Sequence, residues 1–317
     1  MSIIFLFIDG VGLAPAGKSN PFSVVATPGL SSLLEGKSLT LEAADRIYSR
    51  AALLALDANL GVKGRPQSAT GQATLFTGVN AARLLGFHLH GFPIQGDLRK
   101  LLSEKGMFQQ FLDQGLRCTF ANAYKKEFFR HFTGDIKRSY SCSTLINYYA
   151  GLTFRTIEDM LAGRAVYMDI TNEVLQKLGY DVPLISTQQA AERLIAISRD
   201  FDLILYEHFL TDLAGHDGND ARAEKAIRTF DAFLGGVVET MDPDRDLVLA
   251  VSDHGNLEDM QTKTHTRNPV PALLIGKGKE QAARFLQKQK DLTGIVPALK
   301  EWFRQYRPSE MTGGPAD

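Results

Sequence analysis

The chain has 317 residues, of which 44% are hydrophobic and 22% are charged, the balance of a soluble globular protein. Its 35 basic and 36 acidic residues give a net charge of -1, so no positive excess indicates binding to nucleic acid or to an anionic membrane. The two cysteines, Cys118 and Cys142, have no zinc-ligand spacing and are typical of a reducing compartment. The apolar run Ile3 to Ile8 is too short for a signal peptide or a spanning helix. We therefore expect a cytoplasmic protein with no membrane partner.

Short apolar runs along the chain predict strands that are buried on both faces of a sheet. In chain order these runs are Ile3–Ile8, Arg117–Ala121, Leu203–Tyr206, Leu247–Val251 and Ala272–Ile275. Helical patterns lie between them, at Phe108–Gln114, Gln188–Arg199, Ala221–Thr240 and Gln281–Gln289. This alternation predicts an α/β fold with a doubly wound, mostly parallel sheet that helices cover on both faces.

Residues 124–179 do not fit this alternation, because they are rich in aromatic and basic side chains. We predict a small lid or inserted segment here, over the open edge of the sheet; an ordinary amphipathic surface segment is the alternative. Residues 1–123 and 180–306 would then form one catalytic core. The polar, Gly- and Pro-rich stretch 307–317 is expected to be a flexible tail.

Acidic and histidine side chains stand where several of these strands end or begin. They are Asp9, Asp212, His216, Asp253, His254 and His265. In a parallel sheet, ligands bind outside the carboxyl ends of the strands, so these side chains are expected to meet at one rim. Each of them alone could be a turn former or a surface pair. Together, carboxylates and imidazoles suit Zn²⁺, Mn²⁺ or a related ion, and six such groups are enough for two metals.

A turn followed by a helix of small residues covers residues 64–74, and Ser68 stands where this helix begins. There a hydroxyl faces the positive helix end and free backbone N–H groups, which favour an alkoxide and bind phosphate. A metal ion in contact would lower the pKa of the hydroxyl further. Ser68 is therefore the predicted nucleophile of a phosphoryl-transfer site; the alternative is a simple helix cap.

Three competing motifs do not match the sequence. Gly10-Val11-Gly12 follows a strand, as in dinucleotide-binding proteins, but Pro15 occupies the third glycine position. The stretch from Gly64 to Gly71 has the wrong spacing for a Walker loop and no following lysine. Gln67-Ser68-Ala69 is not the GxSxG elbow of a serine hydrolase.

The chain resembles the alkaline phosphatase superfamily, and within it the cofactor-independent phosphoglycerate mutases and phosphopentomutases. The matching motifs, in chain order, are Ile8-Asp9-Gly10, Ser68-Ala69-Thr70-Gly71, Thr211-Asp212-Leu213-Ala214-Gly215-His216, Ser252-Asp253-His254-Gly255-Asn256-Leu257-Glu258 and His265-Thr266-Arg267-Asn268-Pro269-Val270-Pro271. They cover the N-terminal quarter and the C-terminal third of the chain.

The resemblance implies two divalent ions, Mn²⁺ or Zn²⁺, with Mg²⁺ as a third candidate. One ion would be held by Asp9, Asp253 and His254, with Ser68 as fourth ligand. The ligands of the other ion would be Asp212, His216 and His265. Ser68 would attack phosphorus and form a phosphoserine, and the substrate would be a small phosphorylated metabolite.

The chain also departs from the mutase pattern. Ala69 and Gln72 stand where the mutases carry Glu and His, and the segment after Ser68 is too short for their large inserted substrate domain. A mutase must shield its phosphoserine from water, so hydrolysis by a phosphomonoesterase competes with isomerisation. A catalytically silent metal-binding module and a purely structural protein are the remaining alternatives.

Basic residues beside the motifs are candidate substrate contacts. Lys63, Arg65 and Arg267 could pair with a phosphate or carboxylate, as could Arg83 and, from the predicted lid, Lys125, Arg130 and Arg138. The alternative for each is a solvated surface charge.

Overall fold

A central seven-stranded sheet organises the computed structural model, which describes residues 1–132 and 139–307. Its order is β2-β3-β9-β8-β1-β7-β4. The strands are β1 (Ile3–Ile8), β2 (Arg46–Ile47), β3 (Ala51–Leu56), β4 (Cys118–Phe120), β7 (Leu203–His208), β8 (Leu247–Val251) and β9 (Val270–Gly276). A small second sheet pairs β5 (Ala123–Tyr124) with β6 (Arg155–Thr156).

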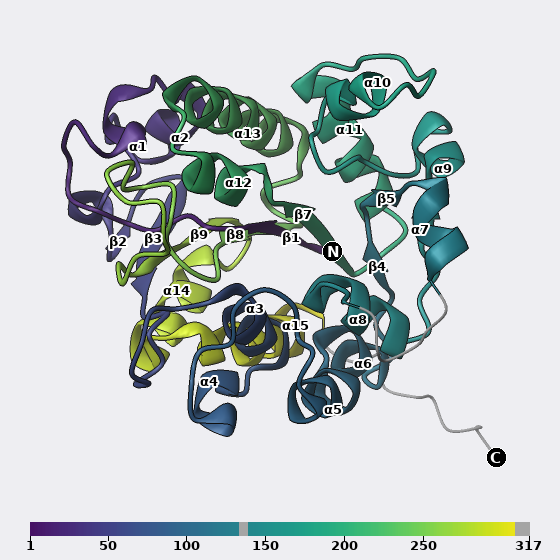
Figure 1. The fold of residues 1–317 in the computed structure, drawn as a ribbon, viewed down its shortest axis with the longest axis horizontal. Helices are drawn as coiled ribbons and strands as arrows, with labels where there is room; N and C mark the ends of the chain where they lie inside the picture. The colour runs from purple at the N-terminus through teal and green to yellow at the C-terminus, as the bar shows by residue number, and fades with distance from the viewer. Residues whose placement is uncertain (133–138, 308–317) are drawn as a thin grey trace.

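Helices cover both faces of the central sheet (Figure 1). The upper layer contains α1 (Pro21–Val24), α2 (Pro28–Leu33), α11 (Thr187–Ser198), α12 (Leu210–Asp217) and α13 (Asp220–Thr240). The lower layer contains α3 (Ser68–Thr77), α4 (Ala81–Leu85), α5 (Gly96–Lys105), α6 (Met107–Leu112), α8 (Cys142–Tyr149), α14 (Lys279–Gln289) and α15 (Ile295–Tyr306). The 3₁₀ helices are η1 (Leu41–Ala43) and η2 (Leu292–Gly294).

Strand β1 shows why both faces need a cover. Successive side chains of a strand point to opposite faces, and all six of its residues are buried. Ile3, Phe5 and Phe7 pack into the lower core, and Ile4, Leu6 and Ile8 pack into the upper core. The fold is thus the predicted doubly wound α/β sandwich, with two hydrophobic cores separated by the sheet.

The predicted strands and helices are all present, but the sheet is more mixed than expected. Strands β8, β1, β7 and β4 are parallel, whereas β9 runs antiparallel to both β8 and β3. Because β9 runs the other way, it starts at the rim where β1, β7 and β8 end. Residues just before β9 therefore reach that rim. Strand β3 was not among the predicted strands.

The predicted lid, residues 124–179, contains two different kinds of structure. Helix α8 packs against α3, α5 and α6, and Cys142, Leu145 and Ile146 belong to the lower core. The remainder includes α7 (Lys126–His131), α9 (Ile157–Leu161) and α10 (Glu173–Lys177). Buried residues around α9 and α10, including Met160 and Leu175, form a small third cluster. The separate inserted unit stays a proposal for this remainder, and Arg138 and the tail 308–317 lie outside the described residues.

No helix in the described ranges is long and apolar enough to span a bilayer.

Candidate metal centre

The ends of β1, β7 and β8 and the loop before β9 bring the predicted ligands to one place. Gly10, directly after β1, has a φ of +70°, and a Cβ there would lie 2.5 Å from the Oδ1 atom of Asp212. Only glycine accepts both this left-handed backbone and this close approach. The loop after β1 can therefore lie directly against the first turn of α12.

One cluster contains Asp9, Asp253, His254 and Ser68. The Nε2 atom of His254 lies 3.3 Å from Asp9 Oδ1, 3.5 Å from Asp253 Oδ2 and 2.9 Å from Ser68 Oγ. Asp253 and His254 are fully buried. Within the described part of the chain, Asp9 Oδ1 and Asp253 Oδ2 have no hydrogen-bond partner. Buried carboxylate oxygens normally have partners, so these two atoms are suited to a cation.

A second cluster, Asp212, His216 and His265, adjoins the first. His216 Nε2 lies 3.4 Å from Asp212 Oδ2, and His265 Nε2 lies 3.7 Å from Asp212 Oδ1. The carboxylate of Asp212 also lies within 4.8 Å of ligand atoms of Asp9 and His254. The rings of His254 and His265 stack with their centroids 3.7 Å apart. Asp212 therefore stands between two adjacent groups of possible ligands.

The hydrogen bonds of the histidines show which ring atom is available to a metal. His265 Nδ1 lies 2.9 Å from the carbonyl oxygen of Pro66, and His216 Nδ1 lies 3.1 Å from that of Lys263. A carbonyl oxygen only accepts, so each Nδ1 carries the proton and each Nε2 carries a lone pair. The two Nε2 atoms are 3.1 Å apart. A cation bound by both would remove the repulsion between their lone pairs, so the residues fit a divalent metal.

In the metal-free protein, burial and neighbouring charges shift the pKa values of these groups: the shift of His265 favours metal binding, whereas a metal must displace a proton from Asp253. Burial raises the pKa of Asp253 well above its usual range, and the nearby Asp9 carboxylate raises it further. Burial lowers the pKa of His265 to about 3, assisted by the charge of His254. A neutral imidazole is the form that binds a metal ion.

A buried carboxylate, Glu258, ties together the loops that carry the ligands. It accepts hydrogen bonds from the amides of Gly12 and Asn256, both at 2.8 Å, and from Asn268 Nδ2 at 3.0 Å. Asn256 Nδ2 in turn donates to Asp212 Oδ1 at 2.7 Å. Glu258 therefore fixes three chain segments relative to one another, and Asn256 orients a predicted ligand.

Ser68 is the first residue of α3, as predicted. The first helical hydrogen bond joins the Gly71 amide to the Gln67 carbonyl, so the amides of residues 68–70 precede the helical ladder. A Cβ at Gly71 would lie 2.7 Å from the Asp253 carbonyl oxygen. The glycine therefore lets α3 approach the loop after β8 closely. Gln72 donates to Asp9 Oδ2 at 3.3 Å.

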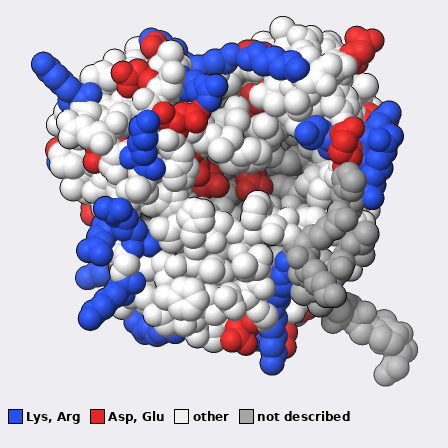
Figure 2. All heavy atoms as spheres, in the orientation of Figure 1, with Lys and Arg blue, Asp and Glu red and all other residues white. Residues whose placement is uncertain are grey.

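A pocket of about 460 Å³ opens beside Ser68, Asp9 and Asp212. Its aromatic lining residues are Phe92, Tyr124, Phe128, Tyr140 and Phe209. In the view of Figure 2, the surface is hollowed near its centre. Acidic side chains gather inside the hollow, and Lys and Arg side chains project around the periphery.

The structure thus brings all seven predicted metal-centre residues together, but not the predicted basic contacts. Lys63, Arg65 and Arg267 are exposed and do not line the Ser68 pocket. Arg267 instead donates to the carbonyl oxygen of Gly64 at 3.1 Å. A substrate contact by these three residues stays a prediction.

Glu207 is a pocket residue that is not among the predicted site residues. It lies in β7, lines the Ser68 pocket and accepts a 2.6 Å hydrogen bond from Ser143 Oγ. Burial raises its pKa to about 7. The sequence does contain a signal for this residue, because Glu207, like Asp9, is an acidic residue at the carboxyl end of a buried apolar run.

The chain is similar to known proteins in sequence and in fold. The chain is 34% identical over 141 residues to the 2,3-bisphosphoglycerate-independent phosphoglycerate mutase of Desulforudis audaxviator; the match covers 42% of this chain and 27% of the relative. The PH0037 protein of Pyrococcus horikoshii has the same fold, with a TM-score of 0.56, 15% identity and coverage of 96% and 97% of the two chains. The alkaline phosphatase of the Antarctic bacterium TAB5 has a TM-score of 0.46, with 14% identity and the same coverage. The metalloenzyme superfamily model matches residues 1–303, and the chain therefore belongs to the metalloenzyme superfamily.

Proposed function

We propose that this protein catalyses metal-dependent phosphoryl transfer with Ser68 as the nucleophile. The observation that carries the proposal is the 2.9 Å distance from Ser68 Oγ to His254 Nε2. The hydroxyl therefore lies inside a cluster in which two buried carboxylate oxygens, Asp9 Oδ1 and Asp253 Oδ2, have no partner in the described chain. A serine that only capped the helix would not need to lie beside a buried imidazole and two buried carboxyl groups.

The ligand assignment follows from the two clusters. Asp9, Asp253, His254 and Ser68 would hold one ion, and Asp212, His216 and His265 would hold the other. Mixed carboxylate and imidazole donors suit Mn²⁺ or Zn²⁺ better than Mg²⁺, which prefers oxygen ligands. When bound, such ions lower the pKa of the serine hydroxyl and offset negative charge on the transferring group.

The residues of the chain account for the remaining parts of the reaction. Ser68 Oγ forms the bond to phosphorus, while the ester oxygen of the substrate leaves with its electron pair. The amides of residues 68–70 are placed to donate to phosphoryl oxygens, as at other helix N-termini. Water, or a second hydroxyl of the product, then takes the phosphoryl group and restores Ser68.

Hydrolysis of a phosphomonoester is the second candidate, beside mutase-like isomerisation. The aromatic walls of the pocket favour a substrate with an apolar or planar group. Among the described residues that line the pocket, none is Lys or Arg. A substrate with a carboxylate, such as a phosphoglycerate, would find no cationic side chain there, although a mutase-like relative is named for such a substrate.

Turnover of an aryl phosphate with Mn²⁺ or Zn²⁺ tests the nucleophile. We expect Ser68→Ala to lose activity and Ser103→Ala, a half-buried serine on α5 outside the Ser68 pocket, to retain it. Equal activity in all three proteins would refute the assignment of Ser68. With 3-phosphoglycerate as substrate, formation of the 2-isomer would indicate a mutase, and free phosphate a hydrolase.

A further inference from the structure

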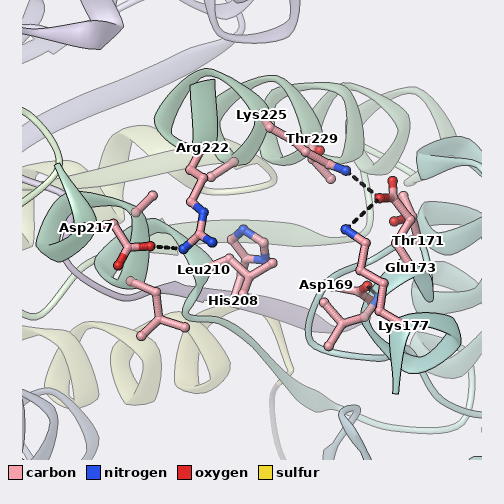
Figure 3. Close-up of a pocket in the computed structure, with 14 residues that line it drawn as sticks. Asp169, Thr171, Glu173, Lys177, His208, Leu210, Asp217, Arg222, Lys225 and Thr229 are labelled. Atoms are coloured by element: carbon pink, nitrogen blue, oxygen red, sulfur yellow. Dashed lines mark hydrogen bonds and ion pairs between the residues drawn. The ribbon is translucent and has the colours of Figure 1, made fainter. Parts of the chain in front are cut away.

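A second pocket, of about 270 Å³, lies on the other side of α12 from the metal centre. Asp212 and His216 face the metal centre, whereas Leu210 and Ala214 line this pocket. Each pair is spaced i, i+4, and the two pairs lie about half a turn apart on the helix. Residues of α10 and α13 complete the walls (Figure 3). A ligand here would occupy space separate from Ser68.

His208, the last residue of β7, lines this pocket and carries an unpaired acceptor. Its Nδ1 atom lies 2.9 Å from the Met168 carbonyl oxygen, so Nδ1 carries the proton and Nε2 carries the lone pair. Nε2 has no partner within the described chain, although the residue is fully buried. Figure 3 shows the ring among the side chains that line the pocket. Burial lowers the pKa of His208 to about 4, so the ring is neutral.

The charged side chains of the pocket balance one another. The carboxylates are Asp169, Glu173 and Asp217, and the cations are Lys177, Arg222 and Lys225. Glu173 pairs with both lysines, and Asp217 pairs with Arg222 (Figure 3). Asp169 accepts two backbone N–H groups. The lining therefore has no net charge and gives no reason for the ligand to carry one.

The volume of the pocket and its apolar lining limit the size and the polarity of the ligand. Val174, Leu213 and Ala226 contribute apolar surface to the pocket that His208 also lines. A protein cavity of about 150 Å³ is known to hold benzene. A pocket of about 270 Å³ has room for a molecule of one ring with a substituent.

We propose that this pocket binds a small neutral molecule of about one ring that carries an O–H or N–H donor, and that this donor bonds to Nε2 of His208. The ligand supplies the partner that the buried imidazole lacks, and its ring lies on the apolar floor. The proposal is independent of the reaction at Ser68.

Phenol and anisole are matched probes, because they share the ring and only phenol has a donor. Calorimetric titration into the zinc-loaded full chain is expected to show roughly fivefold tighter binding of phenol, the difference that one hydrogen bond makes. His208→Phe should abolish this preference. The matched control His88→Phe, at a histidine outside the pocket, should preserve it.

Ala226→Met tests whether phenol binds in this pocket without changing His208. This variant keeps the proposal testable if His208→Phe does not fold. Ala226 lines this pocket but not the Ser68 pocket, so the longer side chain takes up ligand space here and phenol affinity should fall at least tenfold. Equal affinities of phenol and anisole for the wild type would overturn the proposal. So would a phenol preference that survives in His208→Phe, or undiminished phenol binding in Ala226→Met.

Discussion

Substitution of Gly71 by alanine tests the packing that places Ser68. Gly71 is the fourth residue of α3, and a methyl group there would lie 2.7 Å from the Asp253 carbonyl oxygen and 3.2 Å from Asp253 Cβ. Comfortable contacts are about 3.5 Å or longer. A backbone carbonyl cannot rotate aside as a side chain can. Helix α3 or the loop after β8 must therefore move by roughly half an ångström or more.

The magnitude follows from two opposing effects. Alanine is favoured over glycine inside a helix by about 1 kcal/mol, whereas overpacking of a tight site costs about 1–3 kcal/mol. We expect a net loss of up to about 2 kcal/mol in the free energy of unfolding. A displacement of about 1 Å in a catalytic group can lower activity about 100-fold. For this smaller shift of Ser68 we expect roughly a tenfold fall in kcat.

Gly235 provides the matched control, because it is also a helical glycine. It lies within α13, and a Cβ there would meet only Gly29 Cα, at 3.8 Å. Gly235→Ala should therefore raise the unfolding free energy by about 1 kcal/mol and leave kcat unchanged. Urea unfolding and aryl phosphate turnover give both quantities. Equal stability and equal activity of the two variants would show that the Gly71 contact does not position Ser68.

Three further predictions concern the buried carboxylates. Mn²⁺ at about 1,000 times its Kd should stabilise the protein by about 4 kcal/mol. Asp253→Asn should remove most of this gain in thermal melts with little effect on the metal-free form, because the raised pKa favours a neutral carboxyl there and asparagine is a neutral group of similar shape. Glu207, whose folded pKa is raised to about 7 from 4.5, stabilises the fold while protonated, and this contribution is lost as pH rises from 4.5 through about 7. The metal-free wild type should lose roughly 3 kcal/mol of unfolding free energy over this range relative to Glu207→Gln; parallel pH profiles of the two proteins would contradict this. Glu258→Ala should lower the unfolding free energy by about 3 kcal/mol or more, since it leaves buried donors of Gly12 and Asn268 unpaired; a change under about 1 kcal/mol in urea unfolding would contradict the role of Glu258.

The grouping of the candidate ligands was predictable from the sequence, because the geometry of the sheet brings these residues to one edge. Asp9, Asp212 and Asp253 each follow a buried apolar run, and the carboxyl ends of parallel strands share one edge. His265 needed more than this rule. His265 precedes β9 and reaches the rim because β9 runs antiparallel to β8. The alternation of side chains along a strand is the same in either direction, so the sequence pattern does not reveal which way β9 runs.

Other features depend on packing that the local pattern does not contain. The run Ala51–Leu56 forms β3, but three of its six residues are alanine, a residue depleted in strands. Phe128 lines the pocket through contacts of α7 with remote rings such as Phe154. Arg65 adjoins the nucleophile segment in sequence, yet it is exposed and lies outside the pocket.

The position of β1 at the middle of the sheet has a consequence for biosynthesis. Ile3 pairs with Leu203 on one side and Leu247 on the other, so β1 leaves the ribosome long before either neighbour exists. Its six apolar residues must be kept from aggregation in the meantime, by transient nascent-chain contacts or by chaperones. Asp9 can meet Asp253 only once β8 has docked. The capacity to bind metal therefore arises late, as one of the last events of folding on the ribosome.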